Sequence, residues 1–153
     1  MTRLTLQVII LCVFMIGSVS CGPSLVIQNV DYSQPLESVL TPDSENMVHD
    51  QRYAIKFSVS PILEAEGSSS VNEVHLIRNN DGYYFVTANG FQNVYVFAPG
   101  EGELKLENTI EFVENALGEP AFNKREGYIE LVDLSNNESY RLDHEGILEE
   151  ETE

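Results

Sequence analysis

The sequence predicts an α+β fold, in which an antiparallel β meander carries one short helix, at about residues 109–117, packed on the sheet. Two observations indicate the meander: apolar and polar residues alternate over 52–59, and further short β-rich runs are separated by turn residues. A third observation indicates the helix, because only one segment shows a capped helical spacing. An all-β, immunoglobulin-like sandwich is the alternative, which a strand at 109–117 would favour. The length of 153 residues suits a single domain.

The predicted strands begin with Tyr53, Ile55, Phe57 and Val59, which alternate with more polar or smaller residues as in a half-buried strand. Two β-rich runs, 74–78 and 83–88, flank Asn79-Asn80-Asp81-Gly82, whose residues tolerate a positive φ, so a hairpin is expected there. The remaining runs lie at 94–97, 127–134, 139–142 and 147–148. Together they predict consecutive antiparallel strands.

The predicted helix rests on three apolar residues that share one helical face, namely Ile110, Val113 and Leu117. Asn108 is in position to cap its N-terminus. Gly118 is in position to adopt the left-handed conformation after the last turn, and Pro120 prevents the helix from continuing.

The first twenty residues differ from the rest of the chain. Arg3 gives a basic start, 4–16 form a nearly continuous apolar run, and 17–20 are mostly small residues. This order is typical of a secretory signal peptide, and the run is shorter than the roughly 20 apolar residues that a membrane span needs. Residues 1–20 are therefore expected to be removed.

Only one cysteine remains in the mature chain, because Cys12 lies within the segment to be removed. An intramolecular disulfide is then impossible, and Cys21 becomes the first residue. The stretch Ser18-Val19-Ser20-Cys21 resembles the lipobox of bacterial lipoproteins, although Ser18 stands where that family usually has Leu. The resemblance implies that Cys21 is acylated and, since Gly22 follows it in place of Asp, that the outer membrane holds the protein if the cell has two membranes. The alternative is a secreted protein with a free cysteine.

The charge of the chain limits its partners. There are 25 acidic against 8 basic residues, which gives a formal net charge of -17. Nucleic acid is excluded as a partner because phosphate contacts need a basic surface, and electrostatic docking on anionic lipid is excluded for the same reason. The membrane is therefore expected to hold the protein through the lipid on Cys21, and an envelope protein with a basic patch is the expected partner.

The chain is expected to comprise four parts. Residues 1–20 form the signal peptide, and 21–50 form the lipidated N-terminus, with a candidate edge strand at 25–27 and an irregular tether over 33–50. Residues 51–149 form the single α+β domain. The acidic tail at 150–153 is expected to be solvated, since closely spaced like charges repel.

The second half of the chain shows another resemblance. Four features follow one another in it: the stretch 102–106, the helical pattern at 109–117, Leu117-Gly118-Glu119-Pro120, and two β-rich runs that end at 148. This order resembles the module of small lipoproteins of the SmpA/OmlA (BamE-like) type, and β-lactamase-inhibitor-like domains share a related layout. It covers about residues 102–149, and it lacks the tryptophan often found in that family. The resemblance implies a non-catalytic role and no particular functional residue.

No catalytic, metal or cofactor motif is evident. The three histidines, His49, His75 and His144, match no local zinc spacing, and no Gly-x-Ser-x-Gly elbow occurs. The aromatic residues are dense between 83 and 97, and Tyr84, Phe91 and Tyr95 are the candidate partner surface. We therefore expect a lipid-anchored envelope protein that binds or scaffolds, in outer-membrane assembly or maintenance, without cofactor or catalysis. The alternative is a periplasmic hydrolase or metal-binding protein that uses the three histidines and nearby acids.

Overall fold

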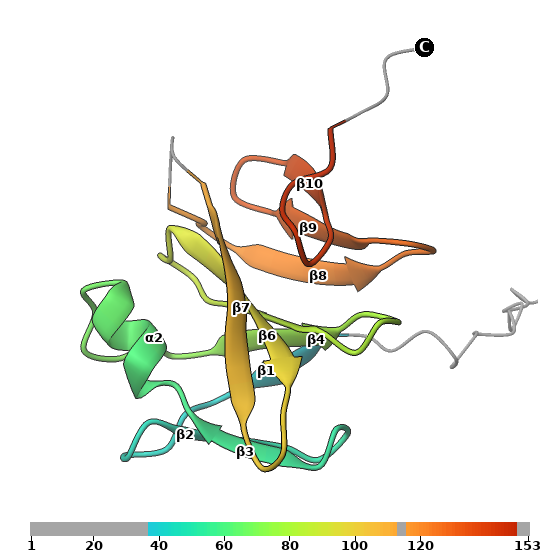
Figure 1. Ribbon diagram of the computed structural model, residues 1–153. Helices are drawn as coiled ribbons and strands as arrows, with labels where there is room; N and C mark the ends of the chain where they lie inside the picture. The colour runs from blue at the N-terminus through green and yellow to red at the C-terminus, as the bar shows by residue number, and fades with distance from the viewer. Residues whose placement is uncertain (1–36, 113–115, 150–153) are drawn as a thin grey trace, which may run out of the picture. The chain divides into compact units, whose positions relative to one another are not determined.

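The computed structural model describes residues 37–112 and 116–149, and Figure 1 shows the arrangement of its elements. The strands are β1 (Ser38–Leu40), β2 (Met47–Asp50), β3 (Ile55–Ser58), β4 (Val74–Arg78), β5 (Tyr84–Thr87), β6 (Asn93–Pro99), β7 (Leu104–Glu111), β8 (Pro120–Lys124), β9 (Ile129–Asp133) and β10 (Glu138–Leu142). The one helix within these ranges is α2 (Ser60–Ala65). The predicted fold class is confirmed: antiparallel sheets with one short helix.

The strands form three sheets. The largest has five strands in the order β1-β4-β5-β6-β7, and the others are the three-stranded sheet β10-β9-β8 and the hairpin β2–β3. In Figure 1 the three-stranded sheet lies above the five-stranded sheet and the β2–β3 hairpin lies below it. The five-stranded sheet is therefore the middle layer.

Each face of the middle sheet has its own hydrophobic core. The first core, shared with β2, β3 and α2, comprises Val48, Val59, Ile62, Leu63, Val74, Leu76, Tyr84, Val86, Ala88, Phe91 and Tyr95. The second core, shared with the three-stranded sheet, comprises Ile77, Phe85, Val94, Val96, Ile110, Phe112, Leu117, Phe122, Ile129, Leu131 and Leu142. Successive side chains of a strand point to opposite faces, so Phe85 enters the second core while Tyr84 and Val86 enter the first.

The predicted hairpin between β4 and β5 is confirmed. Asn79 Oδ1 accepts a hydrogen bond from the Tyr83 N–H at 2.9 Å, and Gly82 has a φ of 97°. The chain reverses here because Asn bonds readily to nearby backbone and glycine adopts a positive φ without steric cost. Strands also occupy the runs predicted near 94–97, 127–134 and 139–142.

The position predicted for the helix is wrong. Strand β7 runs as far as Glu111, and 113–115 lie outside the described residues. Asn108 caps no helix there, because its side-chain amide donates to the carbonyls of His144 and Glu145. Ile110 is opposite Val94 on β6 and enters the second core, so tertiary burial outweighs the helical spacing.

The helix lies instead at Ser60–Ala65. Its proline, Pro61, occupies the first turn, where a missing N–H has no cost, and Gly67 follows the helix with a φ of 66°. Ile62 and Leu63 are its buried residues and enter the first core. The SmpA/OmlA-like module has a helix before Gly118, whereas β7 occupies the start of the segment predicted for that helix, as far as Glu111.

The predicted start of the domain, at residue 51, is too late. Part of the segment expected to be a tether forms β1 and β2, and Ser38 pairs with Leu76 while Val48 pairs with Phe57. Val48 is 1% exposed, so this segment belongs to the core. The signal peptide, the lipidated N-terminus with its candidate strand and the acidic tail lie outside the described residues.

A carboxylate joins the start of β8 to the end of β9. Asp133 is buried and accepts hydrogen bonds from the N–H groups of Gly118, Glu119 and Ser135 and from Ser135 Oγ. Burial raises the pKa of this carboxyl, but the four hydrogen bonds outweigh burial and lower the pKa to about 2. Gly118 is required here because a Cβ at its position would clash with the Ser135 side chain, and not because of the left-handed conformation that we predicted.

We expect Asp133 to make stability depend on pH. Its pKa is lower in the folded protein than the ordinary value of 3.8, so its contribution is present at neutral pH and is lost as pH falls from about 4 to about 2. The shift corresponds to about 2 kcal/mol. Denaturant unfolding of the native protein and Asp133→Asn, measured from pH 7 to pH 2, should show a difference in unfolding free energy that shrinks over this window. The exposed Asp81→Asn is the control, and a difference that stays constant with pH contradicts the assignment.

Candidate functional site

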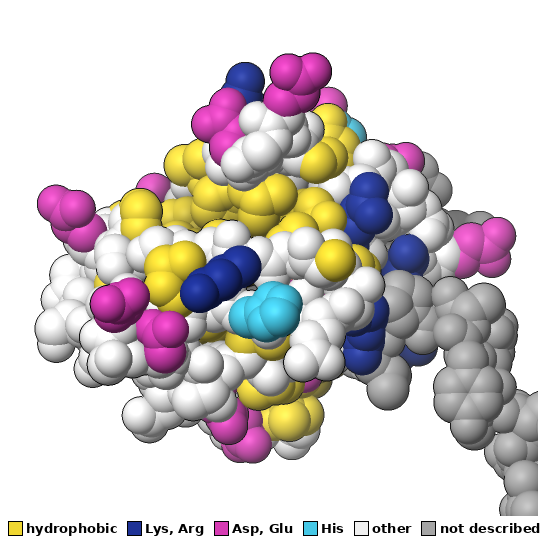
Figure 2. All heavy atoms as spheres, turned by 90° about the horizontal axis from the view of Figure 1, so that it is seen from below, with side chains coloured by type: hydrophobic (Ala, Val, Ile, Leu, Met, Phe, Trp, Pro, Cys, Tyr) yellow, Lys and Arg dark blue, Asp and Glu magenta, His cyan; other side chains and the backbone are white. Residues whose placement is uncertain are grey.

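An open groove lies between β3 and the hairpin of β6 and β7. Its volume is about 720 Å³. The lining residues are Ile55, Lys56, Phe57, Ser58, Pro61, Ile62, Tyr84, Phe97, Pro99, Gly100, Gly102, Glu103, Leu104 and Leu106. Figure 2, a view from the side of the β2–β3 hairpin, shows hydrophobic side chains gathered in a band with charged side chains around it.

The floor of the groove is the face of the middle sheet that carries the first core. Phe97 is opposite Leu106, and Pro99 is opposite Leu104, so their side chains share this face. A bulge between Val96 and Phe97 shifts the register, which turns Leu106 toward the groove although Ile110, four residues on, enters the second core. Leu106 is 56% exposed, so the floor is open to solvent.

One wall of the groove is the backbone edge of β3. All four residues of β3 line the groove and none of β2 does. Since side chains alternate between faces, four consecutive residues can line one groove only if the edge of the strand faces it. The Val59 N–H donates to the Asn46 carbonyl on the β2 side, so alternation directs the N–H and C=O groups of Lys56 and Ser58 away from β2, into the groove.

The candidate partner surface predicted from the aromatic residues is wrong. Tyr84, Phe91 and Tyr95 are 5%, 3% and 4% exposed and lie in the first core. They pack on other rings, as Phe91 does on Tyr95 with centroids 6.5 Å apart. The physical reason is that the middle sheet is covered on both faces where these three residues lie, so neither set of alternate side chains is left outside there. Of the three predicted residues, Tyr84 is the one that lines the groove.

The Tyr95 hydroxyl anchors α2 to the middle sheet. It donates to Glu66 Oε1 at 2.9 Å, and Glu66 also accepts from the Gln92 N–H and the Asn93 side chain. Burial, and then the hydrogen bond to the Glu66 carboxylate, raise the pKa of Tyr95 well above its ordinary value. This tyrosine is therefore a structural hydrogen-bond donor.

The three histidines occupy separate places. His49 is exposed on the outer face of the β2–β3 hairpin, opposite Lys56. His75 Nδ1 lies 3.1 Å from Glu37 Oε2, which also accepts the Phe122 N–H and so links the middle sheet to β8. His144 stacks on Tyr83, with ring centroids 4.4 Å apart.

The histidines do not form a common site. His49 belongs to the layer that covers the first core, whereas His75 is on the opposite face of the middle sheet. His75 is also far from His144. His75 pairs with Thr87, whereas His144 stacks on Tyr83, which lies four residues before Thr87, or roughly 13 Å along the strand. Among residues 37–112 and 116–149, no three His, Cys, Asp or Glu side chains are grouped to hold a metal ion. The histidine cluster that the alternative hypothesis needs is therefore not formed.

A second hollow of about 720 Å³ contains Glu37, His75, Asn89, Glu119 and Ser135 among its lining residues. It is polar, in contrast to the groove. The Glu37 carboxylate is already bonded to β4 and β8, as described above. Glu37, together with His75, thus holds the middle sheet to the three-stranded sheet.

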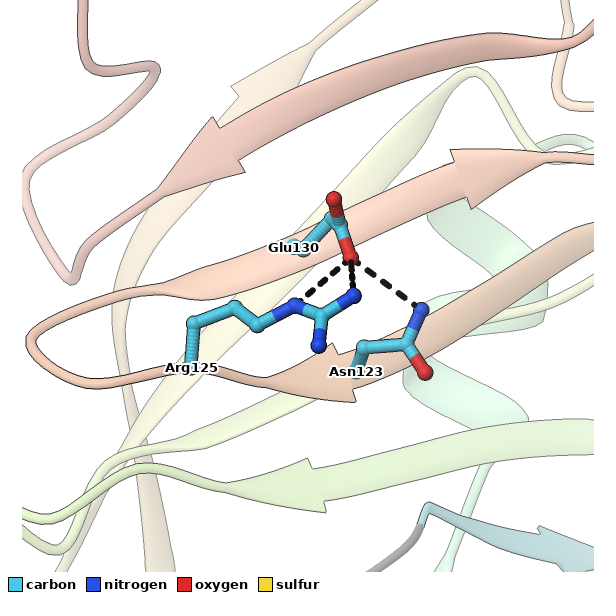
Figure 3. A network of polar contacts seen from close by, with 3 residues as sticks. All are labelled: Asn123, Arg125 and Glu130. Carbon is cyan, nitrogen blue, oxygen red and sulfur yellow. Dashed lines mark hydrogen bonds and ion pairs between the residues drawn. The ribbon is translucent and has the colours of Figure 1, made fainter.

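A polar network covers the outer face of the three-stranded sheet (Figure 3). Glu130 Oε2 accepts hydrogen bonds from Arg125 Nε at 2.9 Å, Arg125 Nη2 at 2.6 Å and Asn123 Nδ2 at 3.3 Å. The Arg125 side chain is half exposed, and exposed ion pairs contribute only a fraction of a kcal/mol to stability. The network joins β8 to β9 and leaves the Arg125 charge neutralised.

Comparisons with known proteins assign the chain to no family, because no family model, curated protein or solved structure matches it significantly. The SmpA/OmlA-like resemblance thus gains no support from them. No helix in the described part of the chain is long and apolar enough to cross a membrane. Cys21 lies outside the described residues, so its role is argued from the sequence. The candidate site of the described domain is the apolar groove.

Proposed function

We propose that this protein is a lipid-anchored protein of the bacterial cell envelope that acts without catalysis, by binding or scaffolding another envelope protein. Outer-membrane assembly or maintenance is the process we infer. The observation that carries the proposal is Cys21, which follows a signal-peptide pattern and small residues and would be the first residue of the mature chain. The open apolar groove supports the binding role.

A covalent anchor suits the charge of this chain. At a net charge of -17, the protein is repelled by an anionic bilayer surface. Each buried CH₂ of an acyl chain contributes about 0.8 kcal/mol, and more than one chain gives stable anchoring. Glu37 lies 16 residues after Cys21, which permits a separation of at most roughly 55 Å. The described domain would therefore act close to the membrane.

The groove supports binding because it leaves apolar side chains open to solvent. Leu106 is 56% exposed there and Phe97 and Leu104 lie partly exposed beside it. Covering such side chains is favourable by about 25 cal/mol per Å² of apolar surface. The acidic body favours a partner with a basic patch, because opposite potentials accelerate and orient the encounter.

Replacing the lipidated cysteine should release the protein from the envelope. In cells fed labelled palmitate, the native protein should incorporate label and sediment with membranes, whereas Cys21→Ser should do neither. Cys12→Ser is the matched control, since Cys12 lies in the segment to be removed, and it should behave as the native protein does. A Cys21→Ser protein that still sediments with membranes contradicts the anchor.

The groove should carry the contact with the partner. We expect mild cross-linking in cells to join the native protein to an envelope protein, and Leu106→Glu to remove that product, because a charge then stands on the apolar floor. Leu134→Glu is the control: Leu134 is 52% exposed and lies outside the groove. Gel mobility and mass spectrometry identify the product. Equal yields from both variants, or no envelope partner in any sample, contradict the proposal.

A further inference from the structure

We propose that the groove binds an extended segment of its partner by strand addition, with the segment pairing as a new strand on the free edge of β3. This inference rests on the proposed binding function and specifies its site and its partner. The segment it fits has alternating apolar and polar residues and a basic residue toward the β6–β7 turn.

The hydrogen-bonding groups for a new strand are already in place. Lys56 and Ser58 direct their N–H and C=O groups into the groove, as the β2–β3 register requires. The two residues are two positions apart, which is the repeat of groups along one edge of an extended strand. Exposed strand edges of this kind are templates for peptide binding.

The floor of the groove determines the side chains of the added strand. A third strand beside β3 would place one set of alternate side chains over Phe97, Leu104 and Leu106. The other set would face outward with Lys56 and His49, which are exposed. An alternation of apolar and polar residues satisfies both faces.

The same edge argues against an acyl chain as the occupant. A hydrocarbon in the groove would cover the N–H and C=O groups of Lys56 and Ser58 without bonding to them. Each buried unpaired group is unfavourable, because its hydrogen bonds to water are lost and not replaced. A polypeptide bonds to these groups and covers the apolar floor at once.

The other free edge near the groove is less suited to pairing. Strand β7 carries Lys105, Glu107 and Glu111 and has the bulge, and charges and bulges are the features that keep edge strands from pairing. Strand β3 is regular over its four residues and carries only Lys56 as a charge. The β3 edge is therefore the one we assign.

The rim of the groove indicates the charge of the segment. Glu103 forms an ion pair with Lys105 at 3.5 Å, and Glu101 lies in the same turn. The turn therefore keeps an excess of acid, within a chain whose net charge is -17. A basic residue at the end of the segment complements it.

The first test removes one hydrogen-bond donor from the edge. The native chain is reconstituted in phosphatidylcholine nanodiscs and titrated with the blocked peptide acetyl-Lys-Val-Thr-Val-Thr-Val-Lys-amide, with binding measured by calorimetry. Lys56→Pro should weaken binding at least tenfold, because proline has no N–H and a proline at an outward-facing edge position leaves the β2–β3 ladder intact. Lys56→Ala, which removes the same charge and keeps the N–H, should bind within about twofold of the native protein.

The second test changes the peptide and does not depend on the folding of a variant. Methylating the backbone nitrogens of the valines or those of the threonines blocks opposite edges of the peptide strand. One of the two methylated peptides should lose binding and the other should retain it. Equal binding of both, equal effects of Lys56→Pro and Lys56→Ala, or no binding at millimolar peptide overturns strand addition.

Other occupants give different results. If an acyl chain is the natural occupant, palmitate should displace the peptide and bind Lys56→Pro as well as it binds the native protein. If a second copy of the chain is the occupant, the native protein should have twice the mass of one chain, and Lys56→Pro should reduce it to the mass of one chain. Either result overturns the proposal. The peptide measurements use purified protein and test strand addition alone. If they fail, the palmitate and cross-linking results on the proposed function still stand, and if the palmitate or cross-linking experiments fail, the peptide result still stands.

Discussion

The rest of the structure depends on one constraint, which is that the five-stranded sheet bears apolar side chains on both faces and both must be removed from water. On β5, Phe85 points to one face and Tyr84 and Val86 to the other, and all three are almost fully buried. Burying a large apolar side chain contributes about 1.5–3 kcal/mol. A layer on each side of this sheet is therefore a requirement of its sequence.

The two covering layers are unequal, and the groove is the consequence. The three-stranded sheet covers the second core and is attached through Glu37, which bonds to Phe122 and lies beside His75. The opposite face has only a two-stranded hairpin and a helix of six residues, which Glu66 holds to the start of β6. This narrower cover ends at β3 and leaves the apolar end of the β6–β7 hairpin open.

Local features of the fold were predictable from the sequence, and features set by distant contacts were not. The hairpin at Asn79–Gly82 depends on a few neighbouring residues, and it was found. The helix was misplaced because Ile110 and Leu117 have helical spacing, although both enter the second core. Pro61 in the first turn of the true helix and Gly67 after its end were helix signals that we did not weigh.

The candidate site, too, has parts that local sequence predicts and parts that depend on distant contacts. The apolar run Tyr84-Phe85-Val86 lacks alternation, which is typical of a strand buried on both faces, and this signal argues against the surface expected at Tyr84. The groove joins β3 to β6 and β7, which are about forty residues apart, so no local pattern predicts it. The anchor at Cys21 is the reverse case, since only the sequence supplies it.

The most direct test of this account is amide hydrogen exchange in the protein without a partner, resolved residue by residue by NMR. If the outer edge of β3 is open, the amides of Lys56 and Ser58 should exchange rapidly. Those of Phe57 and Val59, which point to β2, should be protected. Equal protection of all four amides would mean that the edge is already covered, and it would contradict the account.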